Sequence, residues 1–241
     1  MNFKVDFNIT RLFIDKKVLL QIDQQIIPVY CPPIREYYTN TMWNAIYHLW
    51  TTSEENFTTL PYQVQTAFDI VRVLLFELGQ YSQFRGLANS CADSLAIILP
   101  GIVIDYKNKS LTINDVTITT EIWEYVIYIL KLSCGEKVEQ PRAFASQEER
   151  EFYLKQKEMN SRIQKIKSQN KKADTNGVMK NLLSIIYSFP SLTFDYLFNQ
   201  TMAQIHWLQE MAAGEVSYKL NAQAMAAGNM KKGKKLEFFI K

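Results

Sequence analysis

Apolar side chains alternate with polar ones in residues 3–9, and Val18, Leu20 and Ile22 repeat the same spacing of two. A period of two is typical of a β-strand that packs one face against a core. A polar turn leads from the second stretch into a third apolar run, residues 26–30. Pro32 and Pro33 follow and cannot donate backbone hydrogen bonds, so strand pairing is expected to stop there. The pattern predicts a small β-unit at the start of the chain.

Farther along, apolar residues recur every three or four positions, which predicts a series of amphipathic helices. A predicted β-hairpin with its tip at Asn108 interrupts the series, and Thr120 is the expected N-cap of the helix after it. Thr193 or Ser191 is expected to cap a later helix, which Gly214 separates from the last one. The predicted helices cover residues 34–50, 61–80, 85–99, 121–132, 178–189, 193–213 and 215–227.

Residues 136–145, which contain Pro141, lie between a helix stop and a helix start at Ser146. Such a stretch is typical of a linker. The sequence therefore predicts an N-terminal domain, residues 1–138, and a helical C-terminal domain, residues 146–241. The predicted fold class is α+β and mainly α-helical: an N-terminal α+β part with β-hairpins is followed by an all-helical C-terminal part.

A heavily charged helix is predicted to begin at Ser146. Ser146 and Glu149 have the spacing of a capping box, and the acidic residues of the first turns suit the positive end of the helix dipole. Lysine and arginine dominate farther along, and the apolar positions are few and spaced by seven, four and three: Phe152, Met159, Ile163 and Ile166. So narrow a stripe favours contact with one partner helix. A solvated connector between two subdomains is the simpler interpretation.

Composition limits the classes of function. The chain has 241 residues, of which 47% are hydrophobic and 21% charged, so it can bury a full core. Its net charge of +3 is far below the basic excess of a dedicated nucleic-acid-binding protein. Lysines cluster in residues 231–235, with Phe238 and Phe239 close behind. Because lysines hold phosphates and aromatic rings stack on bases, nucleic-acid binding by this tail stays open as an alternative.

Cysteines and hydropathy bear on the compartment. The chain has three cysteines, an odd number without paired spacing, which favours free thiols in a reducing environment. The first ten residues lack an apolar signal region, and no apolar run reaches the roughly 18 residues of a membrane helix. We therefore expect a cytoplasmic protein without a membrane partner.

The residues that carry chemistry show no catalytic pattern. The sequence contains no Cys-x-x-Cys pair, phosphate-binding loop, dinucleotide fingerprint or serine nucleophile elbow. His48 and His206 stand among apolar neighbours, and neither has a second ligand at metal-binding spacing. The prediction is a protein that is not an enzyme and holds no cofactor or metal.

Several segments of the C-terminal half follow one another in a recognisable order. The charged helix comes first, then the apolar residues 182–188 and the turn Phe189-Pro190-Ser191. Thr201, Gln204 and Ile205 follow in a Thr-x-x-Gln-apolar pattern, and residues 221–229 are rich in alanine and glycine. This order resembles the tail-assembly chaperones of long-tailed bacteriophages, with Ile205 in place of an aromatic residue. A Tyr-x-Pro-Pro type segment in residues 27–36 is similar to phage proteins of Gram-positive hosts.

The resemblance implies a helper protein in the host cytoplasm that binds the phage tape-measure protein and recruits tail tube protein subunits. It also implies that Thr201, Gln204 and Ile205 contribute to partner binding, beside the stripe on the charged helix. A structural subunit of the virion, in the neck, baseplate or hub, is the open alternative. Self-association of the chain stays open as well.

Overall fold

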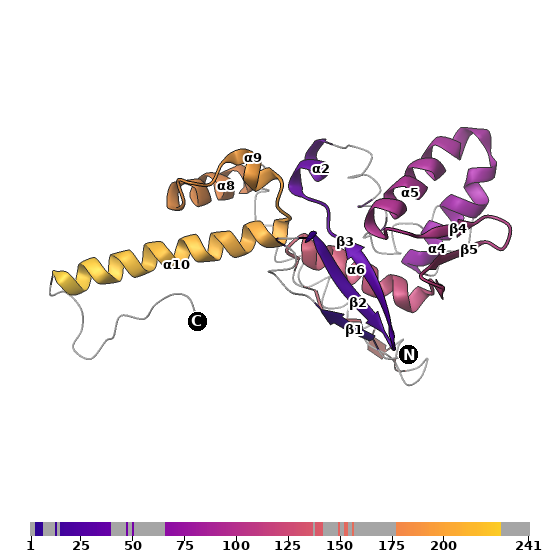
Figure 1. Cartoon of the computed structure of the whole chain (residues 1–241), viewed down its shortest axis with the longest axis horizontal. Helices are drawn as coiled ribbons and strands as arrows, with labels where there is room; N and C mark the ends of the chain where they lie inside the picture. Colours follow the sequence, from indigo (N-terminus) through magenta and orange to yellow (C-terminus); the bar gives the residue numbers. More distant parts are fainter. Residues whose placement is uncertain are drawn as a thin grey trace.

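The structure is a computed structural model that describes residues 3–6, 13, 15–39, 47, 50, 66–136, 138–141, 149, 152–153, 156 and 177–227. Within these ranges the chain forms two antiparallel sheets of three strands each and seven α-helices (Figure 1). The predicted α+β class with a helical C-terminal part is confirmed.

The first sheet is the β-unit that the alternating pattern predicts. Its strands follow in sequence order as β1 (Phe3–Asp6), β2 (Lys17–Ile22) and β3 (Gln25–Tyr30). In the register of β2 with β3, Val18 lies opposite Val29 and Leu20 lies opposite Ile27, and all four side chains are buried. Since side chains alternate between the two faces of a strand, this pairing directs one face of the sheet into the core.

The second sheet contains the predicted hairpin, β4 (Val103–Asp105) and β5 (Ser110–Ile113). Asp105 shapes its tip by accepting hydrogen bonds from the backbone N–H groups of Lys107 at 2.9 Å and Asn108 at 3.0 Å. Hydrogen bonds from Asn108 also hold the pKa of the Asp105 carboxyl below its ordinary value. A third strand, β6 (Val116–Thr117), was not predicted, because two residues are too few to show a period.

Three helical segments support these sheets. The predicted helix 61–80 is observed as α4 (Ala67–Arg72), a π-helical turn (Val73–Glu77) and a 3₁₀ turn (Leu78–Gln80), with residues 61–65 outside the described ranges. The 3₁₀ turn Ser82–Phe84 leads into α5 (Arg85–Ile98), and α6 (Thr120–Ser133) follows the second sheet. The N-cap of α6 is Thr119 and not the predicted Thr120, because Thr119 has the extended backbone and its side chain accepts from the N–H of Ile122.

These elements enclose one large core. Trp50 and Trp123 lie at its centre, both fully buried, with their rings edge to face at a centroid distance of 5.6 Å. Phe68 of α4 packs against Trp123, and the inward residues of β2, β3, α5 and α6 complete the cluster. The core joins the described elements before residue 135 into one support for the C-terminal helices.

The C-terminal helices are α8 (Gly177–Ser188), α9 (Phe194–Phe198) and α10 (Met202–Ala226). They lie together on one side of the molecule, and α10 runs outward away from the sheets (Figure 1). Their small core consists of Leu182, Ile185, Leu197 and Ile205, joined by Ile34 of α2 (Ile34–Thr39). A segment of the predicted N-terminal domain thus completes the core of the predicted C-terminal domain.

The predicted helix 193–213 is wrong in two respects. The chain leaves the helix after Phe198 and starts a new one at Met202, because Thr201 adopts an extended backbone and caps α10. The helix does not stop at Gly214 but continues to Ala226. Glycine inside a helix costs only about 1 kcal/mol relative to alanine, so a single one need not end it.

Much of the predicted charged helix lies outside the described residues, including Met159, Ile163 and Ile166. The same holds for most of the predicted linker and for the lysine cluster at 231–235. Of the charged segment the structure describes residues 149, 152, 153 and 156, all of them helical.

The end of α6 meets the beginning of α10 at Gly135. Gly135 has a φ of +75°, in the left-handed region that L side chains rarely adopt. A Cβ atom there would lie 2.2 Å from Nδ1 of His206. Only glycine therefore allows α10 to approach α6 this closely.

We predict that Gly135→Ala destabilises the fold more than Gly101→Ala. Gly101 is a matched control, because its φ is also positive, at +89°, yet its added Cβ would meet nothing within 4 Å. Each alanine should cost about 1–2 kcal/mol for its left-handed backbone. At Gly135 the crowding against His206 should add about 1–3 kcal/mol. Urea unfolding followed by circular dichroism measures both losses, and equal losses would contradict the close approach.

Candidate protein-interaction surface

The structure places the predicted partner-binding residues in different surroundings. Phe152 is 71% exposed and can reach a partner. Thr201, Gln204 and Ile205 are all fully buried. They are therefore not part of an accessible surface, and their expected role in partner contact is not what this fold provides.

Thr201 and Gln204 instead build the start of α10. The backbone N–H of Thr201 donates to Oε1 of Gln204 at 2.6 Å, and the backbone N–H of Gln204 donates to Oγ1 of Thr201 at 3.3 Å. This reciprocal pair is a capping box, which satisfies N–H groups that a helix start leaves without partners. Ile205 fills the small core next to it. The Thr-x-x-Gln-apolar pattern thus encodes a helix start in this chain.

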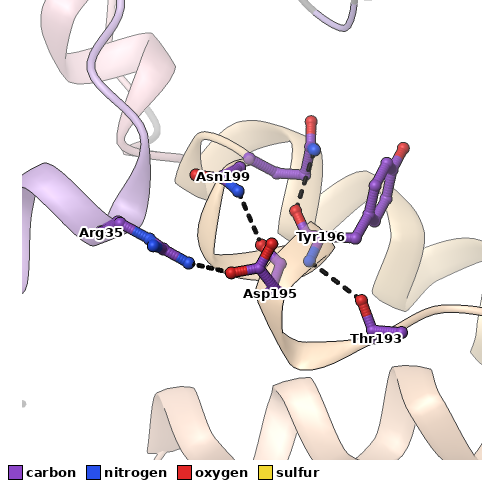
Figure 2. A network of polar contacts seen from close by, with 6 residues as sticks. Arg35, Thr193, Asp195, Tyr196 and Asn199 are labelled. Carbon is purple, nitrogen blue, oxygen red and sulfur yellow. Dashed lines mark hydrogen bonds and ion pairs between the residues drawn. The ribbon is translucent and has the colours of Figure 1, made fainter.

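A polar network around α9 stabilises the non-helical link between α9 and α10 (Figure 2). Oγ1 of Thr193 accepts from the backbone N–H of Tyr196 at 3.2 Å and so caps the first turn. The side-chain amide of Asn199 donates to the carbonyl oxygen of Asp195 at 2.9 Å, and that of Gln200 donates to the carbonyl oxygen of Tyr196 at 3.0 Å. These bonds satisfy carbonyl groups at the end of α9, which keeps it to a single short helix.

Three contacts attach this network to the first part of the chain. Arg35 forms an ion pair with Asp195 (Figure 2). The backbone N–H of Ile34 donates to the carbonyl oxygen of Gln200 at 2.8 Å, and Nζ of Lys16 donates to Oε1 of the same residue at 3.2 Å. Burial lowers the pKa of the Lys16 ammonium below its ordinary value. Gln200 is itself buried, so these bonds fix the helical part at a defined place.

Exposed apolar side chains are concentrated on the three C-terminal helices. Nine of the sixteen exposed large hydrophobic residues within the described ranges belong to residues 177–227. Apolar side chains that are exposed singly are normal in soluble proteins, whereas exposed ones that lie side by side are typical of binding surfaces. The nine residues are Met179, Leu183, Tyr187, Phe194, Tyr196, Trp207, Val216, Leu220 and Met225.

Three of these residues form a row on α8, which we call the α8 stripe: Met179, Leu183 and Tyr187. They are spaced by four, so successive turns of the helix place them side by side. Their exposed fractions are 46%, 53% and 86%. Leu182 and Ile185 on the other side of the helix are fully buried. The helix is therefore apolar both toward the core and toward solvent, and packing among the described residues explains only the inner face.

The charge of this region bears on its partner. Residues 177–227 contain two lysines, Lys180 and Lys219, against Asp195, Glu210 and Glu215. The net charge is thus close to zero and slightly negative. A surface of this kind does not attract phosphate groups, whereas it suits an apolar protein segment.

Groups with chemical reactivity are not gathered on this surface. In the part of the chain that the structure covers, no three His, Cys, Asp or Glu residues lie together in a way that could hold a metal ion. Burial raises the pKa of the Cys31 and Cys91 thiols to about 12, so both stay protonated and unreactive near neutral pH. A shallow pocket of about 300 Å³ beside α4 and α6 contains Arg72 and Lys109, and Lys109 is paired with Glu77.

None of the helices that the structure describes has the length and apolar character needed to cross a lipid bilayer. Comparison of the chain with protein-family models, with curated proteins and with solved structures finds no match.

We predict that Thr201→Ala lowers the free energy of unfolding by about 2 kcal/mol, since it removes a cap and leaves a buried N–H without a partner. Thr193→Ala is the matched control, because it removes the same kind of cap from an exposed position. Water can replace the Thr193 cap, so Thr193→Ala should lower the free energy of unfolding by less than about 1 kcal/mol. Urea unfolding tests both. A Thr201→Ala protein as stable as wild type would show that the capping box does not support α10.

Proposed function

We propose that this protein is a non-catalytic assembly factor that holds a helical protein partner on its C-terminal helices. The observation that carries the proposal is the α8 stripe, a solvent-facing apolar row on a helix whose opposite side already fills a core. Exposing such side chains gains nothing for folding, because their burial contributes to stability only in a complex. We therefore assign the α8 stripe to binding of the partner.

The spacing of the stripe favours a helix as the partner. Residues four apart form a ridge along a helix, and such ridges pack into the grooves of a second helix. A single row recognises an amphipathic helix through anchors on successive turns. Methionine in the row suits a partner of variable sequence, because its unbranched side chain adapts to different surfaces.

The resemblance names the candidate partner. A tail-assembly chaperone binds the tape-measure protein, which is long, helical and prone to aggregate, and recruits tail tube protein subunits to it. We propose this role for the chain, in the host cytoplasm. A shallow stripe repeated over many copies suits the task, since weak contacts can be replaced one by one as the tail tube grows.

A structural subunit of the virion is the second candidate. Permanent interfaces are more apolar than transient ones, and residues 216–226 of α10 carry Lys219 as their one charged side chain. Mass spectrometry of purified particles separates the two roles. An assembly factor is absent from finished virions, whereas a neck, baseplate or hub subunit is present in a fixed copy number.

We predict that the double variant Leu183→Ser, Tyr187→Ser loses capture of the helical partner. Each apolar anchor of a helix interface typically contributes more than 1 kcal/mol, so the pair should weaken binding by roughly tenfold or more. The measurement is co-expression with the long coiled-coil protein of the same gene cluster, followed by co-purification. Both side chains face solvent, so the fold should be unchanged by circular dichroism.

Val103→Ser provides the control, because Val103 is 59% exposed but lies on β4, away from the C-terminal helices. This variant should capture the partner as wild type does. If the double variant keeps the partner soluble to the same degree, the α8 stripe is not the binding surface. A wild-type protein that leaves the partner insoluble contradicts the proposed function itself.

A further inference from the structure

The pocket beside α4 and α6 has the features of a site for a small ligand. Its volume is about 300 Å³, and it lies between α4, the π-helical turn that follows it, the second sheet and the start of α6. Figure 1 shows these elements at the other end of the molecule from α8 and α10. An inference about this pocket therefore goes beyond the proposed function and stands without it.

The wall of the pocket is apolar. It is formed by four buried side chains: Phe68, Phe76, Leu111 and Ile118. Phe76 belongs to the π-helical turn Val73–Glu77, and turns of this kind are rare and occur mostly at functional sites. Small-molecule sites are typically concave and mainly apolar, with a few polar groups that orient the ligand. The wall can therefore hold an apolar group of a ligand.

The polar groups of the pocket come from four different elements. They are the side chains of Arg72 in α4, Ser110 in β5, Thr117 in β6 and Thr120 in α6. Each of these side chains can donate a hydrogen bond. Within the part of the chain that the structure covers, none of the four makes a hydrogen bond or an ion pair. Their donors are therefore available to a ligand.

The charge of the pocket favours an anion. Lys109 also lines it, but its ammonium group pairs with Glu77, so Arg72 supplies the positive charge that is left without a partner. The described lining contains no aspartate and no glutamate. A guanidinium group binds two oxygens of a phosphate or a carboxylate at once, and hydrogen bonds to a charged group are stronger than those between neutral groups.

We propose that this pocket binds a small organic phosphate. The phosphate group takes the hydrogen bonds of Arg72 and the three hydroxyl groups, and an apolar group of the ligand lies against Phe68 and Phe76. Donors from four elements approach an anion from several directions. A phosphate offers three oxygens that accept from different sides, whereas a carboxylate offers two in one plane. Phosphate is therefore the better match to this set of donors.

Calorimetric titration of the full chain with phenyl phosphate tests the ligand class. Phenyl phosphate should bind saturably and roughly tenfold or more tightly than inorganic phosphate, because its ring also buries apolar surface against the wall. Benzoate should bind more weakly than phenyl phosphate, and phenol, which lacks the charge, should not bind saturably. The proposal is overturned if phenyl phosphate does not bind, or if inorganic phosphate or benzoate binds as tightly.

Variants of the full chain test the pocket residues. Arg72→Gln should weaken phenyl phosphate binding roughly tenfold or more, because it removes the charge-assisted hydrogen bonds. Thr120→Val keeps the shape of the side chain without its hydroxyl group and should weaken binding several-fold. Arg72 is exposed and makes no ion pair with described residues, so circular dichroism should show an unchanged fold.

Arg85→Gln is the matched control, because Arg85 is an exposed arginine of α5 that does not line the pocket. It should bind phenyl phosphate as wild type does. If Arg72→Gln and Thr120→Val both bind like wild type, the ligand lies elsewhere and the proposal is overturned. An equal loss in Arg72→Gln and Arg85→Gln overturns it as well, since the attraction then depends only on net charge.

Discussion

The hydrogen bonds between Thr201 and Gln204 fix the first turn of α10, and the exposed surface depends on that turn. Successive residues of a helix are rotated by 100° about its axis. If α10 began one residue earlier or later against the same support, each later side chain would face a different side of the helix. The bond from Ile34 to Gln200 sets the position of the same turn against the first part of the chain. One buried capping box thus determines both where α10 begins and which side chains it presents to solvent.

The molecule combines a support with an unusually apolar outer part. The large core around Trp50 and Trp123 holds the sheets, and Gly135 allows α10 to pack against the end of α6. The helices that extend from this support expose the α8 stripe and carry little charge. Exposed apolar side chains that lie side by side suit contact with another protein, and our proposal of partner binding is based on them.

Sequence periodicity predicted elements that local pattern alone determines. β2 lies where apolar residues recur at every second position, β3 lies in the apolar run that follows, and α8 follows its three-to-four spacing toward Pro190. The break before α10 could not be read in this way, because Leu197, Thr201 and Ile205 also fit one continuous helix. The carbonyl group of Gln200 bonds to Ile34, a contact distant in sequence, and the chain leaves the helix there. Gly214 led to the opposite error, because the roughly 1 kcal/mol that a glycine costs inside a helix is too small to end one.

The exposed α8 stripe was not predicted either, although the sequence held a signal for it. Leu182, Leu183, Ile185 and Ile186 place apolar side chains on more of α8 than one core contact can cover. The resemblance assigned partner contact to Thr201, Gln204 and Ile205 instead. A recurrent motif, however, can reflect a structural need as easily as a contact. The burial of these three residues distinguishes the two interpretations, and that burial can be seen only in the three-dimensional structure.

The central claim is that the α8 stripe holds a helical partner, and site-specific photo-cross-linking tests it most directly. A benzophenone amino acid replaces Tyr187, the most exposed residue of the stripe, and Tyr106, in the turn between β4 and β5, is the control site. The chain is irradiated in cells that express the surrounding gene cluster, and the linked peptides are identified by mass spectrometry. The account predicts cross-links from position 187 to a helical segment of the long coiled-coil protein, and few from position 106. Cross-links from 106 alone, or from neither position while the partner remains soluble, would contradict it.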